Sequence, residues 1–459
     1  MKVKSIVAML VISGIATPVL ATDGYIAHGY GMTSKGMGGV SIAMVKDSFG
    51  GANNPASMVW VGDRLDVGLD FFSPHRSSER SGSLAGIDGL AESGSKMFMI
   101  PEFGYNKMLG RDKAVGVTVY GNGGMNTNYP GGQLAGGAGT VCNSFNPGVA
   151  RYNLLCGTGD LGQNLVQLVV APTFAMKLNQ NNSFGAALLI GYQKFGASGL
   201  DGFYGFTTAP FTPLAANNSL TDRGYDSSHG YGLRLGWMGM VSDSVTLGAA
   251  FATKMSMSKF DKYKDLFAGQ GYFDIPATFS LGISYKASPI VTVAADYKRI
   301  DYSGIKSVNN PSTNIGNAVP ATGFTIGSLG CDTCRGFGWD SVNVIKLGAE
   351  YQYNPSLILR VGYDHTDNPV QSRDVTFNIL APGIVQDHFT AGFTYNLSKT
   401  SELTMAYMHA FKNSMTAPSL YNNYVTTTPG IPGGIGIAGN ETIKLYEDSI
   451  GIAYGVKFQ

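Results

Sequence analysis

The alternation of short and long connections is the sequence feature that most restricts the fold of this chain. From Arg64 to Phe458, fourteen segments alternate apolar and polar residues, as β-strands with one apolar and one polar face do. Successive connections are alternately short and long along the whole run. A soluble β-sandwich has no reason for this alternation, whereas a transmembrane β-barrel has tight turns at one end and long loops at the other. The predicted strands are residues 64–73, 97–107, 113–121, 164–178, 182–196, 228–240, 244–257, 275–286, 290–303, 341–353, 356–368, 386–396, 401–412 and 443–458.

Composition indicates that much of the surface faces lipid. Only 14% of the 459 residues are charged, whereas soluble domains average about 25%. The chain has 63 glycines, 24 tyrosines and 24 phenylalanines, without an apolar run that could form a spanning helix. We therefore predict an all-β fold, a 14-stranded antiparallel transmembrane β-barrel. The net charge of +1 gives no support to nucleic-acid binding.

The first 21 residues have the pattern of a secretory signal peptide. Lys2 and Lys4 precede an apolar core over residues 6–16, and Val19-Leu20-Ala21 offers a cleavage site before Thr22. An exported barrel with an even number of strands has both chain ends on the periplasmic side. We therefore expect the mature protein to lie in the bacterial outer membrane.

Residues 22–62 lack the alternation of a strand and are rich in Gly, Ala, Ser and Asn. Apolar residues recur at helical spacing between Val40 and Phe49, which predicts a short helix there. A turn signal follows at Asn54-Pro55-Ala56, where proline fixes φ. We interpret this segment as a plug. The predicted domains are a signal peptide (1–21), an N-terminal hatch (22–62) and a transmembrane barrel (63–459).

Charged residues in the strands are expected to face the lumen, because a lipid-facing Lys or Arg near the bilayer midplane costs about 2–4 kcal/mol. The alternation in 341–353 and 356–368 places Lys346 and Arg360 inside, with Leu359 and Val361 outside. Inward cations could hold a ligand carboxylate. The alternative is pairing with Asp296, Glu350 and Asp364 in a structural network. The four candidates are Lys346, Arg360, Arg234 and Lys298.

Two long connections are apolar for surface loops, and exposed apolar patches normally mark binding sites. We predict that they form an external hydrophobic site, although simple packing between loops is an equal alternative. The candidate ligand-binding residues are Phe203, Phe206, Phe211 and Leu214 in one loop, and Phe260, Leu266 and Phe267 in the next.

The chain has four cysteines, and an even number in an exported protein favours disulfides. We expect Cys142 to pair with Cys156 and Cys331 with Cys334. The C-x-x-C spacing of the second pair is also found in redox and metal sites. No second close pair and no histidine cluster accompanies it, so we expect neither a metal nor another cofactor.

Several motifs, in order along the barrel pattern, resemble the FadL/TodX family of outer-membrane transporters for long-chain fatty acids and other hydrophobic compounds. They span essentially the whole mature chain, although each one alone is short. The similar stretches are Gly36-Met37-Gly38-Gly39, Lys46-Asp47, Asn54-Pro55-Ala56, Ile275-Pro276-Ala277-Thr278, Leu281–Tyr285, Lys346–Tyr351, Arg360–Tyr363, Asn368–Val370 and Ala391–Tyr395.

The resemblance implies a fourteen-stranded barrel plugged by a hatch, with Asn54, Pro55 and Ala56 as its gating motif. It also implies that ligand is caught by external loops and leaves through a lateral gap when the hatch shifts. Interruptions near Asn106, Gly121 or Pro172 are candidates for that gap. The expected function is passive uptake of long-chain fatty acids or other hydrophobic small molecules.

Other classes of surface barrel are alternatives to uptake. A barrel with long loops could act as an adhesin, a surface antigen or a phage receptor, and one with a polar open lumen as a non-specific porin. An enzyme is not expected, because no nucleophile lies near a base at a recognised spacing. The expected partners are a fatty acid or other hydrophobic ligand, outer-membrane lipid and lipopolysaccharide, with the protein as a monomer and no nucleic acid.

Overall fold

The computed structural model describes most of the mature chain. The described residues are 23–83, 87–136, 142–143, 146–207, 219–316, 319–321, 324–326, 328–423 and 438–458. The predicted signal peptide, residues 1–21, lies outside them. Within the described residues, no helix is long and apolar enough to cross a membrane.

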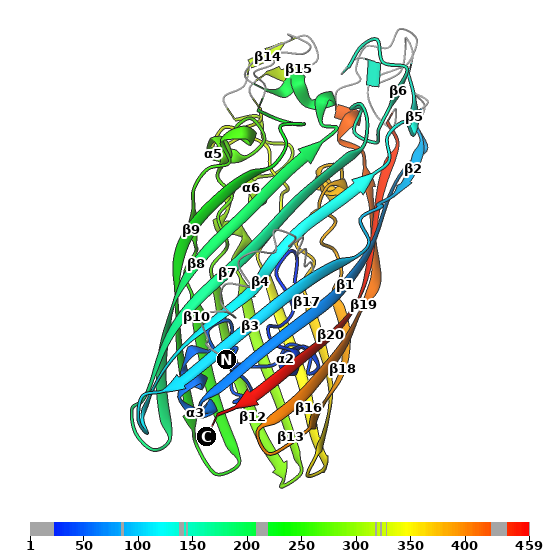
Figure 1. Ribbon diagram of the computed structural model, residues 1–459. Coiled ribbons are helices and arrows are strands. Elements are labelled where there is room, and N and C mark those ends of the chain that lie inside the picture. The colour runs from blue at the N-terminus through cyan, green and yellow to red at the C-terminus, as the bar shows by residue number, and fades with distance from the viewer. Residues whose placement is uncertain are drawn as a thin grey trace.

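Fourteen antiparallel strands form a closed barrel (Figure 1). Each strand pairs with the next along the chain, and β20 pairs with β1 along its whole length, from Arg64↔Lys457 to Ser81↔Asn440. The predicted fold class is thus confirmed. The barrel strands are β1 (Arg64–Ser81), β3 (Phe98–Met108), β4 (Lys113–Tyr129), β7 (Leu161–Lys177), β8 (Asn182–Ser198), β9 (Asp226–Met240), β10 (Val245–Ala252), β12 (Thr278–Ser288), β13 (Val291–Ile300), β16 (Val342–Asn354), β17 (Leu357–Thr366), β18 (Asp387–Asn396), β19 (Ser401–Pro418) and β20 (Asn440–Lys457).

The long connections gather at one end of the barrel, and the N and C labels of Figure 1 lie in the opposite half. We take the loop end as extracellular, as in other outer-membrane barrels. The loops carry strands β2 (Gly89–Glu92), β5 (Leu134–Ala135), β6 (Arg151–Tyr152), β11 (Ser256–Met257), β14 (Val319–Ala321) and β15 (Phe324–Ile326). Their helices are η2 (Asp201–Phe206), η3 (Asp261–Tyr263), α5 (Ala268–Gly271), η4 (Tyr302–Gly304), α6 (Lys306–Asn309), η5 (Ser372–Asp374), η6 (Phe377–Ile379) and η7 (Leu420–Asn423).

The strand faces follow the predicted alternation. On β17, Leu359 and Val361 are 39% and 45% exposed, whereas Arg360 between them is 7% exposed. Lys346 on β16 is also buried, and its neighbours Ile345 and Leu347 face outward. The outer wall is therefore apolar and the charged side chains face the lumen, as a barrel in lipid requires.

Residues 23–62 lie inside the lower half of the barrel, where Figure 1 draws them in blue. They contain three short helices, α2 (Met32–Lys35), η1 (Pro55–Ser57) and α3 (Met58–Val61). The helix predicted between Val40 and Phe49 is wrong, because that stretch forms turns. Val40 and Met44 pack against Met37 and Ala294 without helical backbone. Their spacing therefore reflects packing on the barrel wall.

The hatch touches the wall through paired charges and glycines. Lys46 forms an ion pair with Glu350 at 2.6 Å, and Lys35 pairs with Asp70. At Gly362 on β17, a Cβ atom would lie 2.1 Å from the backbone nitrogen of Gly38. Glycine therefore permits the close approach of hatch and strand.

Candidate functional site

The extracellular loops enclose a small, mostly apolar cavity of about 20 Å³, with room for about one water molecule. A larger ligand can enter only if the lining side chains move. The lining residues are Leu155, Gln163, Ala197, Leu200, Phe203, Leu220, Leu266, Phe267, Ser307, Leu329, Arg335, Gly336, Phe337, Phe377 and Leu380.

Three of the predicted ligand-binding residues, Phe203, Leu266 and Phe267, line this cavity. Phe206 packs on Phe203 with ring centroids 5.8 Å apart, and Phe260 packs behind Phe267 at 6.0 Å. All four phenylalanines are buried, so the apolar loops form an interior and not an exposed patch. Phe211 and Leu214 lie outside the described residues. Ligand binding by this set stays a prediction.

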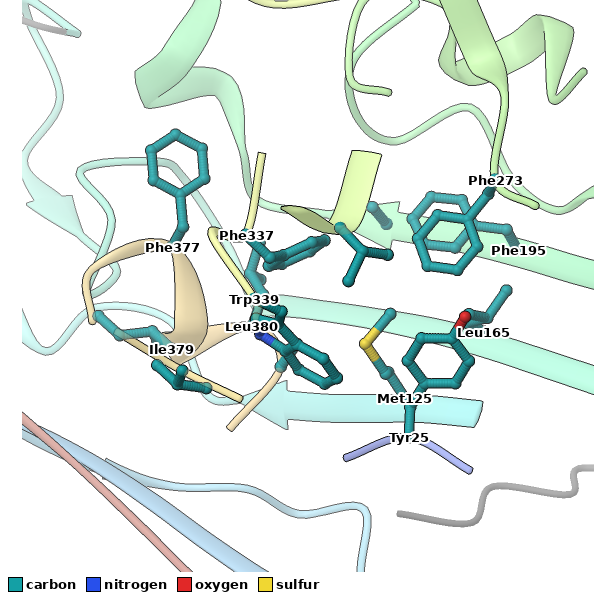
Figure 2. Close-up of a cluster of buried hydrophobic side chains, with 14 of the residues drawn as sticks. Tyr25, Met125, Leu165, Phe195, Phe273, Phe337, Trp339, Phe377, Ile379 and Leu380 are labelled. Carbon is teal, nitrogen blue, oxygen red and sulfur yellow. The ribbon is translucent and has the colours of Figure 1, made fainter. Parts of the chain in front are cut away.

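Aromatic rings continue from the cavity down to the start of the hatch (Figure 2). Phe267 contacts Phe273 at a centroid distance of 5.1 Å, and Phe273 contacts Tyr25 at 5.9 Å. Trp339 reaches the same tyrosine at 5.8 Å. Figure 2 shows Tyr25 pointing into a cluster with Met125 and Phe273. The cavity and the hatch thus share one apolar interior.

Hydrogen bonds join the two loops, residues 301–341 and 367–386, that supply part of the lining of the loop cavity. Trp339 donates from Nε1 to Asn378 Oδ1 at 2.6 Å, and Asn378 Nδ2 donates to the Phe337 carbonyl at 2.8 Å. Asp374 accepts from the Ser312 backbone N–H at 2.7 Å. Burial raises the pKa of Asp374, although this hydrogen bond opposes the shift. The loop walls are therefore fixed by buried hydrogen bonds as well as by packing.

Both expected disulfides are present in the structure. Cys142 pairs with Cys156, with Cα atoms 4.8 Å apart, and Cys331 pairs with Cys334 at 4.9 Å. The second bridge directly precedes the cavity-lining residues 335–337. No group of three or more potential metal ligands occurs among the residues that the structure describes.

A second, more polar cavity of about 50 Å³ lies between hatch and wall. Three of the predicted cations, Arg234, Lys298 and Lys346, line it together. Asp23, the first described residue, lies between the two lysines, with Oδ2 at 3.5 Å from Lys298 Nζ and 3.4 Å from Lys346 Nζ. Lys346 also pairs with Asp364 at 3.2 Å. A hatch carboxylate thus occupies the position between two of the cations that were predicted to contact a ligand carboxylate.

The other predicted cations have structural partners as well. Arg234 donates to the carbonyls of Gly51 and Ala52 in the hatch. Arg360 is not part of the polar cavity; it pairs with Glu350 at 3.0 Å and donates to Thr394. Lys346 and Arg360 thus have the carboxylate partners that the pairing alternative named, whereas Lys298 pairs with Asp23 and Arg234 with backbone carbonyls. Ligand contact by the four cations stays a prediction.

The Asn54-Pro55-Ala56 turn anchors the hatch to the wall. Asn54 donates from Nδ2 to the Ile42 carbonyl at 2.8 Å and to the Trp237 carbonyl of β9 at 2.9 Å. A Cβ atom at Gly236 would lie 2.0 Å from Asn54 Oδ1. The turn thus packs directly against the β9 backbone at Gly236, where a side chain would collide with it. The gating role of the turn stays a prediction.

The wall is split between β3 and β4. Their pairing runs only from Met108↔Ala114 to Phe103↔Val119, although both strands continue beyond it. β4 contains a bulge between Gly121 and Gly123, and residues 120–127 are buried on both faces. The break in pairing therefore begins beside Gly121, one of the positions expected for a lateral gap.

The hatch fills this split from inside. Gly124 donates to the Tyr25 carbonyl at 2.9 Å, and Ala27 donates to the Asn122 carbonyl at 3.2 Å. Tyr30 donates its hydroxyl to the same carbonyl at 3.1 Å. The chain from Tyr25 to Ala27 thus takes the place of the missing neighbour strand and satisfies the open edge of β4.

Sequence reasoning missed several residues that build this path. They are Asp23, Tyr25, Phe273, Trp339, Phe377 and Leu380. One signal was available for the last two, because residues 375–385 read VTFNILAPGIV, an apolar run in a long connection. Asp23 and Tyr25 gave no such signal, since their roles depend on where the hatch meets strands far along the chain.

Comparisons with known proteins agree with this architecture. Residues 157–428 match the family model described as outer membrane protein transport protein (OMPP1/FadL/TodX). No curated protein sequence matches the chain. Three of the solved structures with a similar fold match this chain over nearly the whole length of both chains.

The first is the Pseudomonas putida toluene transporter TodX, with a TM-score of 0.63, 17% identity and coverage of 94% of this chain and 99% of that one. The second is the Ralstonia pickettii toluene transporter TbuX, with a TM-score of 0.60, 18% identity and coverage of 94% of this chain and 99% of that one. The third is a Pseudomonas aeruginosa FadL homologue, with a TM-score of 0.63, 13% identity and coverage of 95% of this chain and 100% of that one.

Replacing both Phe203 and Phe267 with serine should weaken binding of an apolar fluorescent probe such as pyrene to the purified protein in detergent. Burial of one phenylalanine side chain is worth roughly 1.5–3 kcal/mol, so we expect the dissociation constant to rise by about tenfold or more. Tyr272→Ser is the matched control, because Tyr272 is 45% exposed and does not line the cavity. Equal affinity of the double variant and the wild type would show that the cavity is not the binding site.

Proposed function

Because this chain belongs to the OMPP1/FadL/TodX family of outer-membrane transport proteins, we propose that it takes up small hydrophobic molecules by passive diffusion. Family membership confirms the resemblance seen in the motifs and makes the protein a transport channel and not an enzyme. The observation that carries the proposal is the apolar path from the loop cavity through Phe273 to Tyr25, where the hatch meets the split wall.

Two ligand classes match the apolar chemistry of this path, long-chain fatty acids and neutral hydrocarbons such as toluene. TodX and TbuX are toluene transporters, and a neutral hydrocarbon needs no exchange of charges in the lumen. A fatty acid could use Lys298 and Lys346, but its carboxylate must compete with Asp23. We therefore propose neutral hydrophobic compounds as the preferred substrates, with fatty acids as the second class.

We further propose that residues 22–62 act as a hatch and that ligand leaves between β3 and β4. Support comes from the backbone hydrogen bonds of Tyr25 and Ala27 to β4, which close the split. Movement of these few residues would open the wall without unfolding a strand. The proposal includes cleavage of the signal peptide before Thr22, function as a monomer, and lipopolysaccharide among the surrounding outer-membrane lipids.

The alternatives have less support. A non-specific porin needs an open lumen, whereas this lumen is filled by the hatch. Ser73 Oγ does lie 3.3 Å from His75 Nε2 on the outer wall. However, Ser73 donates to the Lys96 carbonyl, and Asp448, the cross-strand partner of Ser73 on β20, binds His409. This arrangement does not activate the serine as a nucleophile. An adhesin binds through its outer surface, so this role does not explain the apolar residues inside the barrel.

Cells that express the protein in an outer membrane without related channels should take up labelled toluene faster than cells with an empty vector. The rate should rise linearly with concentration and need no energy source, because the proposed transport is diffusion. Uptake of glucose should stay at the empty-vector level. Unchanged toluene and oleate uptake together with faster glucose entry would contradict the proposal and favour a porin.

Asp23→Asn should strengthen binding of oleate to the purified protein, because it removes the carboxylate that competes for Lys298 and Lys346. A hydrogen bond to a charged group is worth roughly 1.5–3 kcal/mol, so we expect the oleate dissociation constant to fall by about tenfold. Toluene binding is the internal control and should not change. If oleate affinity stays the same, the lysine pair does not bind ligand carboxylates.

A further inference from the structure

The upper border of the split is closed by one arginine. Arg76 lies on the lumen face of β1 and is 5% exposed. Its guanidinium donates from Nη1 to the Asn126 carbonyl of β4 and from Nη2 to the Ser95 carbonyl of the segment before β3. A single side chain thus ties together the two sides of the wall just above the unpaired stretch.

A buried carboxylate without a partner lies beside this arginine. Glu447 on β20 is fully buried, and among the described residues neither of its carboxylate oxygens has a hydrogen-bond partner. Arg76 pairs with Leu445 across the β1–β20 ladder, so Glu447 is its diagonal neighbour on the lumen face, within reach of a long side chain. The charge of Arg76 acts on the Glu447 carboxyl group more strongly than those of Asp23 and Asp448. Buried carboxylates without partners are rare and costly.

The Arg76 guanidinium therefore has two sets of acceptors. It either bridges the carbonyls of Ser95 and Asn126, as it does here, or pairs with Glu447 and releases β4. Ser95 and Asn126, whose carbonyls accept from Arg76, both line an open groove of about 410 Å³. Arg76 thus holds together two residues of the groove lining.

We propose that Arg76 is a specificity-determining residue that sets the size of the lateral opening, with Glu447 as its alternative partner. When Arg76 leaves the carbonyls, the next tie above it is the hydrogen bond from Gly94 to the Asn128 carbonyl. The upper limit of the opening moves from Asn126 to Asn128, which adds roughly 7 Å at about 3.4 Å per residue. The added length admits fused-ring compounds. This inference rests on the proposed exit between β3 and β4.

The test compares uptake of phenanthrene with uptake of toluene in cells that express each variant. Arg76→Met removes the tie, so the phenanthrene-to-toluene ratio should rise several-fold. Glu447→Gln removes the competing carboxylate and keeps Arg76 on the carbonyls, so the ratio should fall. Arg76→Lys keeps the positive charge but lacks the rigid guanidinium fork, whose two nitrogens reach the two carbonyls separately, so it should give an intermediate ratio. Opposite effects of two neutralising changes are not expected from general loss of stability.

Arg80→Met is the matched control. Arg80 also faces the lumen from β1, but it pairs with Glu441 at 2.7 Å and donates to the Leu154 carbonyl, away from β4. It should leave the ratio unchanged. Hydrogen exchange provides a second readout, since the amides of residues 122–128 should exchange faster in Arg76→Met and not in Arg80→Met.

The outcomes separate this inference from the proposed function. Wild-type cells that take up neither probe would overturn both. Normal toluene uptake with wild-type ratios in Arg76→Met and Glu447→Gln would overturn only the role of Arg76. If Arg76→Met does not insert into the membrane, Glu447→Gln decides, and an unchanged ratio in that variant overturns the inference.

Discussion

The open backbone edge of β4 is the constraint on which the rest of this structure depends. A barrel in lipid must pair every strand edge, yet β3 stops pairing with β4 at Phe103↔Val119. The hatch residues Tyr25 to Ala27 complete the hydrogen bonds from inside. Plug and wall are therefore one hydrogen-bonded system, and the weakest part of the wall is the part that the hatch can release.

Ion pairs between the hatch and the barrel strands keep the hatch next to the open edge of β4. Lys298 and Lys346 hold Asp23 just before the sealing residues, while Lys46 and Glu350 hold the hatch from below. Buried ion pairs add little net stability, but breaking one leaves an unpaired charge. They therefore fix the position of the hatch. The apolar residues lie above it, so polar anchoring and apolar binding occupy different levels of the same lumen.

The sequence predicted the barrel well because the lipid imposes a regular pattern. Strand alternation placed Arg360 and Lys346 inside and Val361 outside, as observed. It could not show that Asp23 lies beside Lys346, since that contact joins residues more than three hundred positions apart. The split was also hidden, because β3 and β4 read as an ordinary strand pair and only the glycines near Gly121 hinted at a break.

The most direct test of the account ties the hatch to β4 covalently. Tyr30 can be replaced by p-azidophenylalanine, which keeps the ring whose hydroxyl donates to the Asn122 carbonyl. Irradiation should cross-link it to β4, and peptide mapping should find the link beside Asn122. The account predicts that toluene uptake stops on cross-linking and continues in irradiated wild type. Undiminished uptake by the cross-linked protein would show that ligand does not leave past the hatch and β4.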